Sequence, residues 1–235
     1  MKWLRHFYKK HRRLLIVAAG LAVLAVAAVL VLPMLPERRS AFLDRPALPY
    51  QPISAAEVGG VLLPNAELPP LRQRVTDSAV LLNGRVSYFW GGKSDAIGFD
   101  PAWGEPRVVE SRGSETTGQT LPYGMDCSGF LTWCFVQSGI SFEQAKRAIG
   151  NGSENQWKRS YKVEWENLLP GDFVFQHRPG GADGNHVGIV LGFDGAGEPV
   201  IAHCSYSLGG CVITGRGDIF IYARRPYYYE ETEGQ

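Results

Sequence analysis

Cysteine is scarce in this sequence, with only four among 235 residues. So few cannot build the disulfide scaffold of a small secreted domain, so the chain must fold around an apolar core. Paired spacings typical of zinc sites, such as C-x-x-C or H-x-x-x-H, are also missing. A zinc site is conceivable by ligand type alone, from Cys127, His186, His203 and Cys204. We therefore expect neither a metal nor an organic cofactor.

The sequence also lacks an internal repeat, a low-complexity tract and a basic surface for nucleic acid. Residues 2–13 hold six Lys and Arg and no acidic residue, so without them the net charge of +1 becomes about −5 for the remainder. A body with this charge argues against a protein that binds nucleic acid through phosphate contacts. The 45% hydrophobic content is that of an ordinary globular protein.

One long apolar run lies near the N-terminus. Leu14 to Leu32 are 19 consecutive residues without charge, enough for a helix to cross roughly 30 Å of hydrocarbon. We expect a transmembrane anchor at 14–35, with the basic tail 1–13 in the cytoplasm and the body outside. The alternative is a cleaved signal peptide, for which Ala25-Val26-Ala27 supplies an A-x-A triplet, although cleavage there would leave an exposed apolar terminus.

The body divides into a linker and one α+β domain. Residues 36–70 are rich in proline and predict a stiff linker, and residues 71–228 predict the domain, followed by an acidic tail at 229–235. Helices are expected from Leu71 to Leu82 and from Asp126 to Ser138. The later runs predict an antiparallel meander of strands at Phe173–His177, His186–Phe193, Pro199–Cys204, Cys211–Gly215 and Ile219–Arg224.

Candidate chemistry begins at Cys127, in the first turn of the second predicted helix. A helix N-terminus favours negative charge, so the thiol pKa there can fall below the ~8.5 of a free thiol. By itself such a cysteine more often serves packing. His186 and His203 lie on consecutive predicted antiparallel strands, which places them on one face as a base and the group that orients it.

Four motifs together carry a family resemblance. They are Tyr88-Phe89-Trp90-Gly91-Gly92, Asp126-Cys127-Ser128-Gly129-Phe130, Leu169-Pro170-Gly171-Asp172-Phe173-Val174-Phe175 and His186-Val187-Gly188-Ile189-Val190-Leu191-Gly192. In this order they resemble the signature of NlpC-type cell-wall cysteine peptidases, a papain-like family. The resemblance covers residues 70–226 and implies a papain-like core of N-terminal helices packed on an antiparallel sheet.

The resemblance also implies roles for individual residues. Cys127 resembles the nucleophile, His186 the general base and acid, and His203 the third member that orients the base. Tyr88 resembles the tyrosine whose hydroxyl assists the oxyanion hole beside the Cys127 backbone N–H. Asp126 and Ser128 resemble residues that line the pocket for the free amino end of the stem peptide.

The function implied by the resemblance is hydrolysis of peptidoglycan stem peptides, between D-glutamate and a diamino acid. Together with the anchor expected at 14–35, this predicts a single-pass protein of the bacterial cell membrane with its catalytic domain outside. Two alternatives stay open. An amidase or acyltransferase would use the same Cys-His pair, because acyl-enzyme chemistry is shared. A wall-binding module would recognise stem peptides without cutting them.

The sequence departs from the family pattern at residues 93–125, which separate the Trp-Gly-Gly motif from the nucleophile. This insertion is either a lid or specificity loop over the cleft or a tolerated, solvated surface loop. Among the other cysteines, Cys134 is expected in the core. Cys204 and Cys211 are expected to face each other across a hairpin, either as a disulfide or as two reduced buried thiols.

Overall fold

The computed structural model describes residues 68–180, 185–217 and 219–233. The expected basic tail at 1–13, the anchor at 14–35 and nearly all of the linker at 36–70 therefore lie outside the described residues. Within the described ranges, no helix has the length and apolar character needed to span a membrane.

Five α-helices and a 3-10 turn make up the helical part of the described chain. They are α4 (Pro70–Leu81), α5 (Cys127–Gln137), α6 (Phe142–Ile149), α7 (Ser153–Lys158), η2 (Trp165–Asn167) and α8 (Tyr227–Glu233). The proline at the first position of α4 costs nothing, because that N–H has no partner within a helix. Asp126 caps α5, its Oδ1 accepting from the Gly129 N–H at 2.6 Å. Both predicted helices are confirmed, and every residue of α5 is buried.

Eight strands form two sheets in the described residues. They are β1 (Pro106–Val108), β2 (Thr120–Pro122), β3 (Ser160–Lys162), β4 (Phe173–Phe175), β5 (Val187–Phe193), β6 (Pro199–Ser205), β7 (Gly210–Gly215) and β8 (Tyr222–Pro226). Strands β1 and β2 form a hairpin inside the insertion, and the other six form one antiparallel sheet in the order β3-β8-β4-β5-β6-β7. The predicted strands exist close to their expected positions.

The last strand corrects the predicted meander. Strand β8 does not continue beside β7 but returns to the far side of β4, where Arg224 is opposite Phe173. The outer edge of β7 is covered instead by the segment after α4, since the Gly84 N–H donates to the Cys211 carbonyl at 2.8 Å and the Cys211 N–H donates to Val86 at 2.9 Å. A short run of residues before the Tyr88 motif thereby joins the sheet.

The end of the domain also differs from the prediction. Residues 227–233 form α8, and Tyr229 is fully buried, so the expected acidic tail begins inside a helix that belongs to the folded domain. The cause lies in the tyrosine run at its start, because the Tyr229 ring packs inward, whereas Tyr227 is exposed and Glu230 and Glu231 stay on the surface. Tyr229 lies 5.7 Å from the Phe135 ring of α5.

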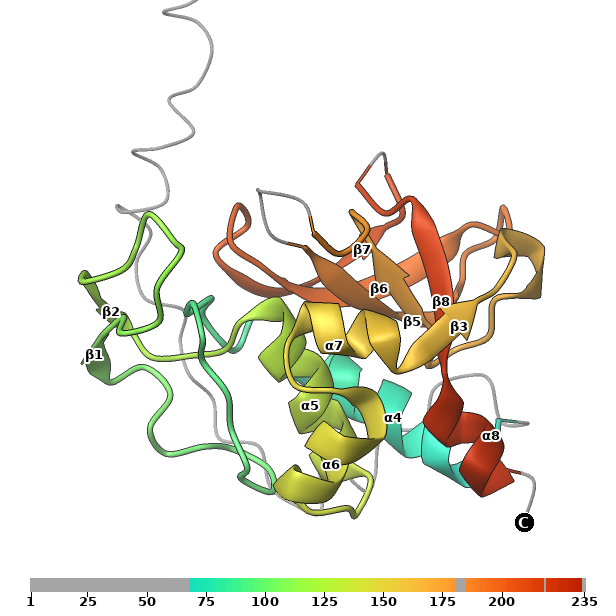
Figure 1. Ribbon diagram of the computed structural model, residues 1–235, viewed down its shortest axis with the longest axis horizontal. Helices are drawn as coiled ribbons and strands as arrows, with labels where there is room; N and C mark the ends of the chain where they lie inside the picture. The colour runs from blue at the N-terminus through green and yellow to red at the C-terminus, as the bar shows by residue number, and fades with distance from the viewer. Residues whose placement is uncertain (1–67, 181–184, 218, 234–235) are drawn as a thin grey trace, which may run out of the picture. The chain divides into compact units, whose positions relative to one another are not determined.

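The core lies between two helices and the sheet. Helices α4 and α5 pack against each other and against β5 and β6 (Figure 1). Phe130, Leu131 and Phe135 of α5 meet Phe173 and Ile189 of the sheet in one buried cluster. Cys134 is fully buried in this cluster, which confirms its predicted place in the core.

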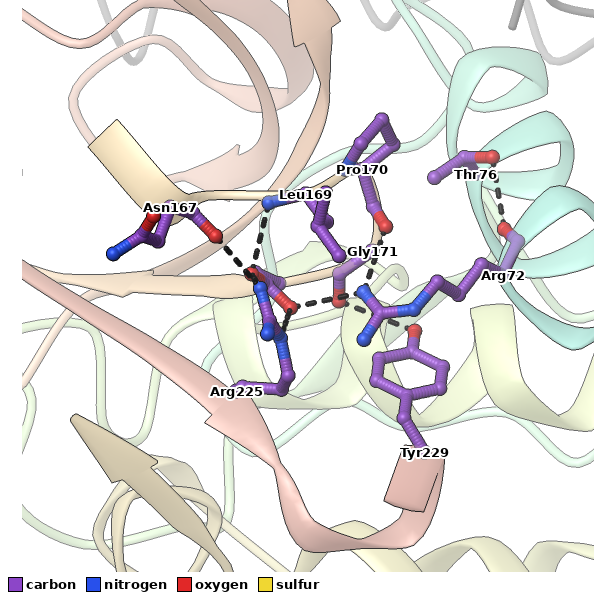
Figure 2. A network of polar contacts seen from close by, with 9 residues as sticks. Arg72, Thr76, Asn167, Leu169, Pro170, Gly171, Arg225 and Tyr229 are labelled. Carbon is purple, nitrogen blue, oxygen red and sulfur yellow. Dashed lines mark hydrogen bonds and ion pairs between the residues drawn. The ribbon is translucent and has the colours of Figure 1, made fainter. Parts of the chain in front are cut away.

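A buried ion network fastens the helical layer to the sheet. The Asp172 carboxylate, fully buried, accepts from Arg72 Nη1 of α4 at 2.9 Å and from Arg225 Nη2 of β8 at 2.7 Å. Arg72 also donates to the Pro170 carbonyl at 2.9 Å, and its guanidinium lies 3.9 Å above the Tyr229 ring. Figure 2 shows Arg72 and Arg225 converging here from different elements. The Leu-Pro-Gly-Asp motif is therefore a structural junction.

We predict that Asp172→Asn lowers the free energy of unfolding by about 3–5 kcal/mol, because two guanidinium groups lose the charge that compensates their burial. Urea denaturation followed by tryptophan fluorescence measures this loss. The control is Glu164→Gln, which removes an ion pair whose side chains are 73% and 62% exposed and should cost less than about 1 kcal/mol. Equal effects of the two substitutions would contradict the prediction.

Candidate active site

The start of α5 is packed backbone to backbone against the Tyr88-to-Gly92 motif. The Asp126 N–H donates to the Gly92 carbonyl at 3.1 Å. A Cβ at Gly129 would lie 2.2 Å from the Gly92 oxygen, and a Cβ at Gly92 would lie 2.2 Å from the Gly124 oxygen. Only glycine permits these approaches. The two glycine-containing motifs therefore fix the position of the first turn of α5, which carries Cys127.

Cys127 lies at the first position of α5, and its thiol faces the start of β5. The Sγ atom lies 3.8 Å from the carbonyl oxygen of Asn185, next to His186. Burial raises the pKa of Cys127 to about 12, and the Asp126 carboxylate adds to the rise, whereas the Lys93 charge and nearby backbone N–H groups oppose it. The expected lowering of the pKa by the helix N-terminus is thus outweighed, because the thiol is only 7% exposed.

The two histidines lie in direct contact. His186 Nε2 is 2.8 Å from His203 Nδ1, and His203 Nε2 is 3.0 Å from Thr214 Oγ1 of β7. Burial lowers the pKa of His186 to about 3, with the neighbouring His203 adding to the effect, and burial lowers the pKa of His203 to about 4. Both imidazoles are therefore neutral at physiological pH.

The hydrogen-bond network assigns their tautomers. The Thr214 hydroxyl donates to the Gly215 carbonyl at 2.9 Å, so its oxygen accepts from His203 Nε2–H. The Nδ1 atom of neutral His203 then accepts from His186 Nε2–H. This leaves Nδ1 of His186 unprotonated, which is the state of a base that can receive a proton. The direction of every bond follows from Thr214, a residue that sequence reasoning did not single out.

Small and aromatic neighbours hold the imidazoles in place. Gly188 lies beside His203, and a Cβ there would be 3.2 Å from His203 Cβ and 2.7 Å from an Ile201 methyl. The fully buried Phe220 ring stacks on His186 at 5.5 Å and meets His203 edge-on at 5.2 Å. The apolar ring covers one side of the pair and thus contributes to the burial that lowers both pKa values.

Tyr88 lies beside the same cysteine. It pairs with Met125, two residues before Cys127, and its ring meets the Tyr206 ring edge-on at 5.5 Å. Burial raises the pKa of Tyr88 above its ordinary value, and the neighbouring Cys127 adds to the rise. The phenol therefore keeps its proton and is able to donate a hydrogen bond.

Asp126 and Ser128 flank the cysteine and bind a lysine of the insertion. Lys93 Nζ donates to Ser128 Oγ at 3.0 Å and lies 3.7 Å from Asp126 Oδ1. Ser128 Oγ in turn donates to Asp126 Oδ1 at 2.7 Å. The ammonium that both residues contact in this structure belongs to Lys93, and their predicted role toward a substrate amino end stays a prediction.

The insertion at 93–125 is packed against the domain at some positions and exposed at others, including all of β1. Trp103 is 3% exposed and its ring lies 5.9 Å from that of Trp133 in α5. Farther along, the Tyr206 hydroxyl donates to Glu115 Oε1 at 2.6 Å, which brings the insertion to the turn between β6 and β7, beside Tyr88. Tryptophan thus anchors one part of the segment in the core, while most of residues 105–120 are exposed. The role of the insertion, as a lid or specificity loop or as a tolerated surface loop, stays a prediction.

Cys204 and Cys211 are directly opposite each other on β6 and β7. Both are buried free thiols, which agrees with the second of the two expectations. Cys204 Sγ lies 3.1 Å from the Met125 carbonyl, on the strand-like segment that leads to Cys127. In the described residues no group of three or more His, Cys, Asp or Glu side chains is arranged to hold a metal ion.

A family model described as "NlpC/P60 family" matches residues 84–208, more than half of the chain. The chain belongs to the NlpC/P60 family. The match runs from the segment that covers β7, through the nucleophile candidate and both histidines, to the turn after β6. It therefore includes all of the sequence-predicted site residues.

Curated proteins resemble parts of this NlpC/P60 chain. "Probable endopeptidase Rv2190c" of Mycobacterium tuberculosis is 32% identical over 75 residues, which are 32% of this chain and 17% of that protein. "Gamma-DL-glutamyl hydrolase" of Bacillus subtilis is 28% identical over 123 residues, 48% of this chain and 28% of that protein. The aligned part is thus less than a third of the length of either relative.

Among solved structures, the peptidoglycan hydrolase RipB of Mycobacterium tuberculosis matches with a TM-score of 0.45 and 23% identity, over 72% of this chain and 70% of that one. RipD of the same species, described as a non-catalytic NlpC/p60 domain protein, matches with a TM-score of 0.41 and 18% identity, over 64% of this chain and 95% of that one.

Other residues of the candidate site escaped sequence reasoning. Thr214 and Phe220 carry no motif, and only their position in the folded sheet brings them to the imidazoles. Lys93 directly follows the Trp-Gly-Gly motif, so its closeness to that motif was a usable signal. We missed this signal because we assigned Lys93 to the insertion.

We predict that Cys127 reacts with iodoacetamide at least about a hundredfold more slowly than free cysteine at pH 7, since its raised pKa leaves very little thiolate. The rate should keep rising beyond pH 9. Mass spectrometry of the folded protein measures it, with Cys127→Ala showing the background from the three other cysteines. A plateau between pH 5 and pH 8 would instead reveal a preformed thiolate–imidazolium pair.

Proposed function

We propose that this chain is a cysteine endopeptidase that hydrolyses peptidoglycan stem peptides, at the bond between D-glutamate and a diamino acid. Cys127 is the nucleophile, His186 the base and acid, and His203 the residue that orients the base. We further propose that residues 14–35 anchor the protein in the bacterial cell membrane, with the domain outside, on the strength of the uncharged run Leu14 to Leu32.

The observation that carries the proposal is the hydrogen-bonded series from Thr214 through His203 to His186. It supports a neutral His186 whose Nδ1 can accept a proton. His186 directly follows Asn185, whose carbonyl oxygen is contacted by the Cys127 thiol. This arrangement has the three parts that thiol catalysis needs, which are a nucleophile, a base and a group that fixes the tautomer of the base.

The resting groups are both neutral, so the thiolate is made during the reaction. Each group alone resists ionisation in its buried site. Proton transfer from Sγ to His186 creates opposite charges side by side, and their attraction offsets the cost of burying each one. Sγ then attacks the peptide carbonyl carbon, and the oxyanion is stabilised by the Cys127 backbone N–H and the Tyr88 hydroxyl.

The second half of the reaction uses the same residues in reverse. His186 gives its proton to the nitrogen of the leaving amine as the peptide C–N bond breaks, which leaves a thioester on Cys127. A water molecule, deprotonated by His186, then attacks the thioester carbonyl and releases the carboxylic acid and the thiol. An amidase would follow the same steps, and an acyltransferase would replace this water by an amine.

We predict that Cys127→Ala abolishes release of new termini from purified peptidoglycan while the protein stays folded. The matched control is Cys134→Ala, seven residues later in the same buried helix, which should keep activity and lose about 1–2 kcal/mol of stability through a small cavity. Mass spectrometry of the released fragments identifies the bond, and circular dichroism checks folding.

The same digestion separates the competing functions. New amino termini on the diamino acid support the endopeptidase, new termini at the sugar-linked end support an amidase, and products joined to added amines support an acyltransferase. If the protein sediments with the peptidoglycan but releases no fragments from it, the enzyme proposal is overturned in favour of a binding module. Full activity in Cys127→Ala would overturn the assigned nucleophile.

We also predict a graded loss at His203, because an orienting residue does not itself receive the proton from the thiol. His203→Asn should keep partial activity, since an amide can still accept from His186 Nε2–H, whereas His203→Ala should lose about a hundredfold in kcat. His186→Asn should be as inactive as Cys127→Ala. Wild-type kinetics for His203→Ala would assign the orienting role elsewhere.

A further inference from the structure

A lysine ammonium lies beside the proposed nucleophile. Lys93 Nζ donates to Ser128 Oγ and is within ion-pair distance of Asp126 Oδ1, and these two residues flank Cys127 in the sequence. The Lys93 side chain is 24% exposed and the Asp126 side chain 12% exposed. Asp126 is therefore nearly buried, whereas the Lys93 side chain keeps contact with solvent at the edge of the site.

The lysine is held in this position from its backbone. The Tyr123 hydroxyl donates to the Lys93 carbonyl at 2.6 Å, and the preceding Gly92 carbonyl accepts from the Asp126 N–H at 3.1 Å. The tight packing around Gly92 prevents this segment from moving away from α5. Lys93 is thus presented to Asp126 by the same contacts that place the nucleophile.

Two acceptor atoms beside the cysteine, Asp126 Oδ1 and Ser128 Oγ, already have partners within the chain. Asp126 Oδ1 accepts from the Gly129 N–H at 2.6 Å and from Ser128 Oγ at 2.7 Å, besides its ion pair with Lys93. A carboxylate next to a nucleophile would otherwise attract a cationic group of the substrate. With Lys93 in place, an incoming ammonium would meet a like charge a few ångströms away and would have to displace a charge-assisted hydrogen bond.

We infer that Lys93 fills the cation site formed by Asp126 and Ser128, and that the preferred substrate is a stem peptide whose amino end is acylated and therefore uncharged. Such a peptide is one still joined to the glycan by an amide. The inference rests on the proposed function and makes Lys93 a specificity-determining residue. It also changes the expectation that Asp126 and Ser128 receive a free amino end, because the chain supplies that ammonium itself.

Two synthetic peptides test this inference. Both have the sequence L-Ala-γ-D-Glu-meso-diaminopimelate-D-Ala, one with a free amino end and one N-acetylated. Wild-type protein should have an equal or higher kcat/KM for the acetylated peptide. Lys93→Met should shift the ratio of the two kcat/KM values toward the free amine by about tenfold or more, since a hydrogen bond to a charged group becomes available to the substrate.

Controls separate the local effect from a loss of charge or of folding. Lys93→Arg keeps the cation and should keep the wild-type ratio. Lys158→Met removes an ammonium that pairs with Glu154 on α7, with side chains 61% and 62% exposed, and should also leave the ratio unchanged. Lys93→Gln provides a second neutral variant if Lys93→Met does not fold, as judged by circular dichroism.

A binding measurement keeps this test independent of turnover. In a Cys127→Ala background, calorimetry should show that Lys93→Met raises the affinity for the free-amine peptide and not for the acetylated one. A wild-type preference of tenfold or more for the free amine, or a ratio and an affinity that Lys93→Met leaves unchanged, would overturn the inference. Failure to cut either peptide while the affinities shift as expected would instead overturn the proposed hydrolysis.

Discussion

The buried Asp172 carboxylate is the constraint on which the arrangement of layers depends. A charge removed from water must be matched inside the protein, and here it is matched by Arg72 from the first helix and Arg225 from the last strand. Three segments far apart in the chain therefore have one relative placement that satisfies them all. This placement sets α4 against the sheet, and α4 in turn packs against α5.

The candidate site lies where the N-terminus of α5 meets the N-terminus of β5. The glycine contacts of α5 fix Cys127, the sheet register fixes His186 and His203, and Thr214 on the next strand fixes the proton positions. Cys127 and the two histidines of this series are neutral at rest because burial opposes the charged form of each. In the proposed mechanism, Cys127 and His186 become charged only during the reaction, whereas Asp126 and Lys93 form an ion pair beside the cysteine at rest.

Much of this could be read from the sequence where the determinants are local. The periodicity and caps located α4 and α5, the β-branched runs located β4 to β7, and four short motifs indicated the family and the candidate residues. Positions that depend on tertiary partners could not be read in this way. The return of β8 to β4 is fixed by Arg225 and Asp172, and the burial of Tyr229 by Arg72 and Phe135. Trp103 packs against Trp133 from within an insertion for which the sequence left a lid and a tolerated surface loop as alternatives. Thr214 matters only because β7 lies beside β6.

The two edges of the six-stranded sheet affect how readily copies of this domain aggregate at high concentration. At one end the backbone of β7 is already occupied by the segment around Val86, and at the other end β3 is only three residues long. A free strand edge is a template for pairing with another chain, and its danger grows with its length. This sheet leaves little of that template exposed, so the domain can be concentrated on a surface with little tendency to aggregate through strand addition.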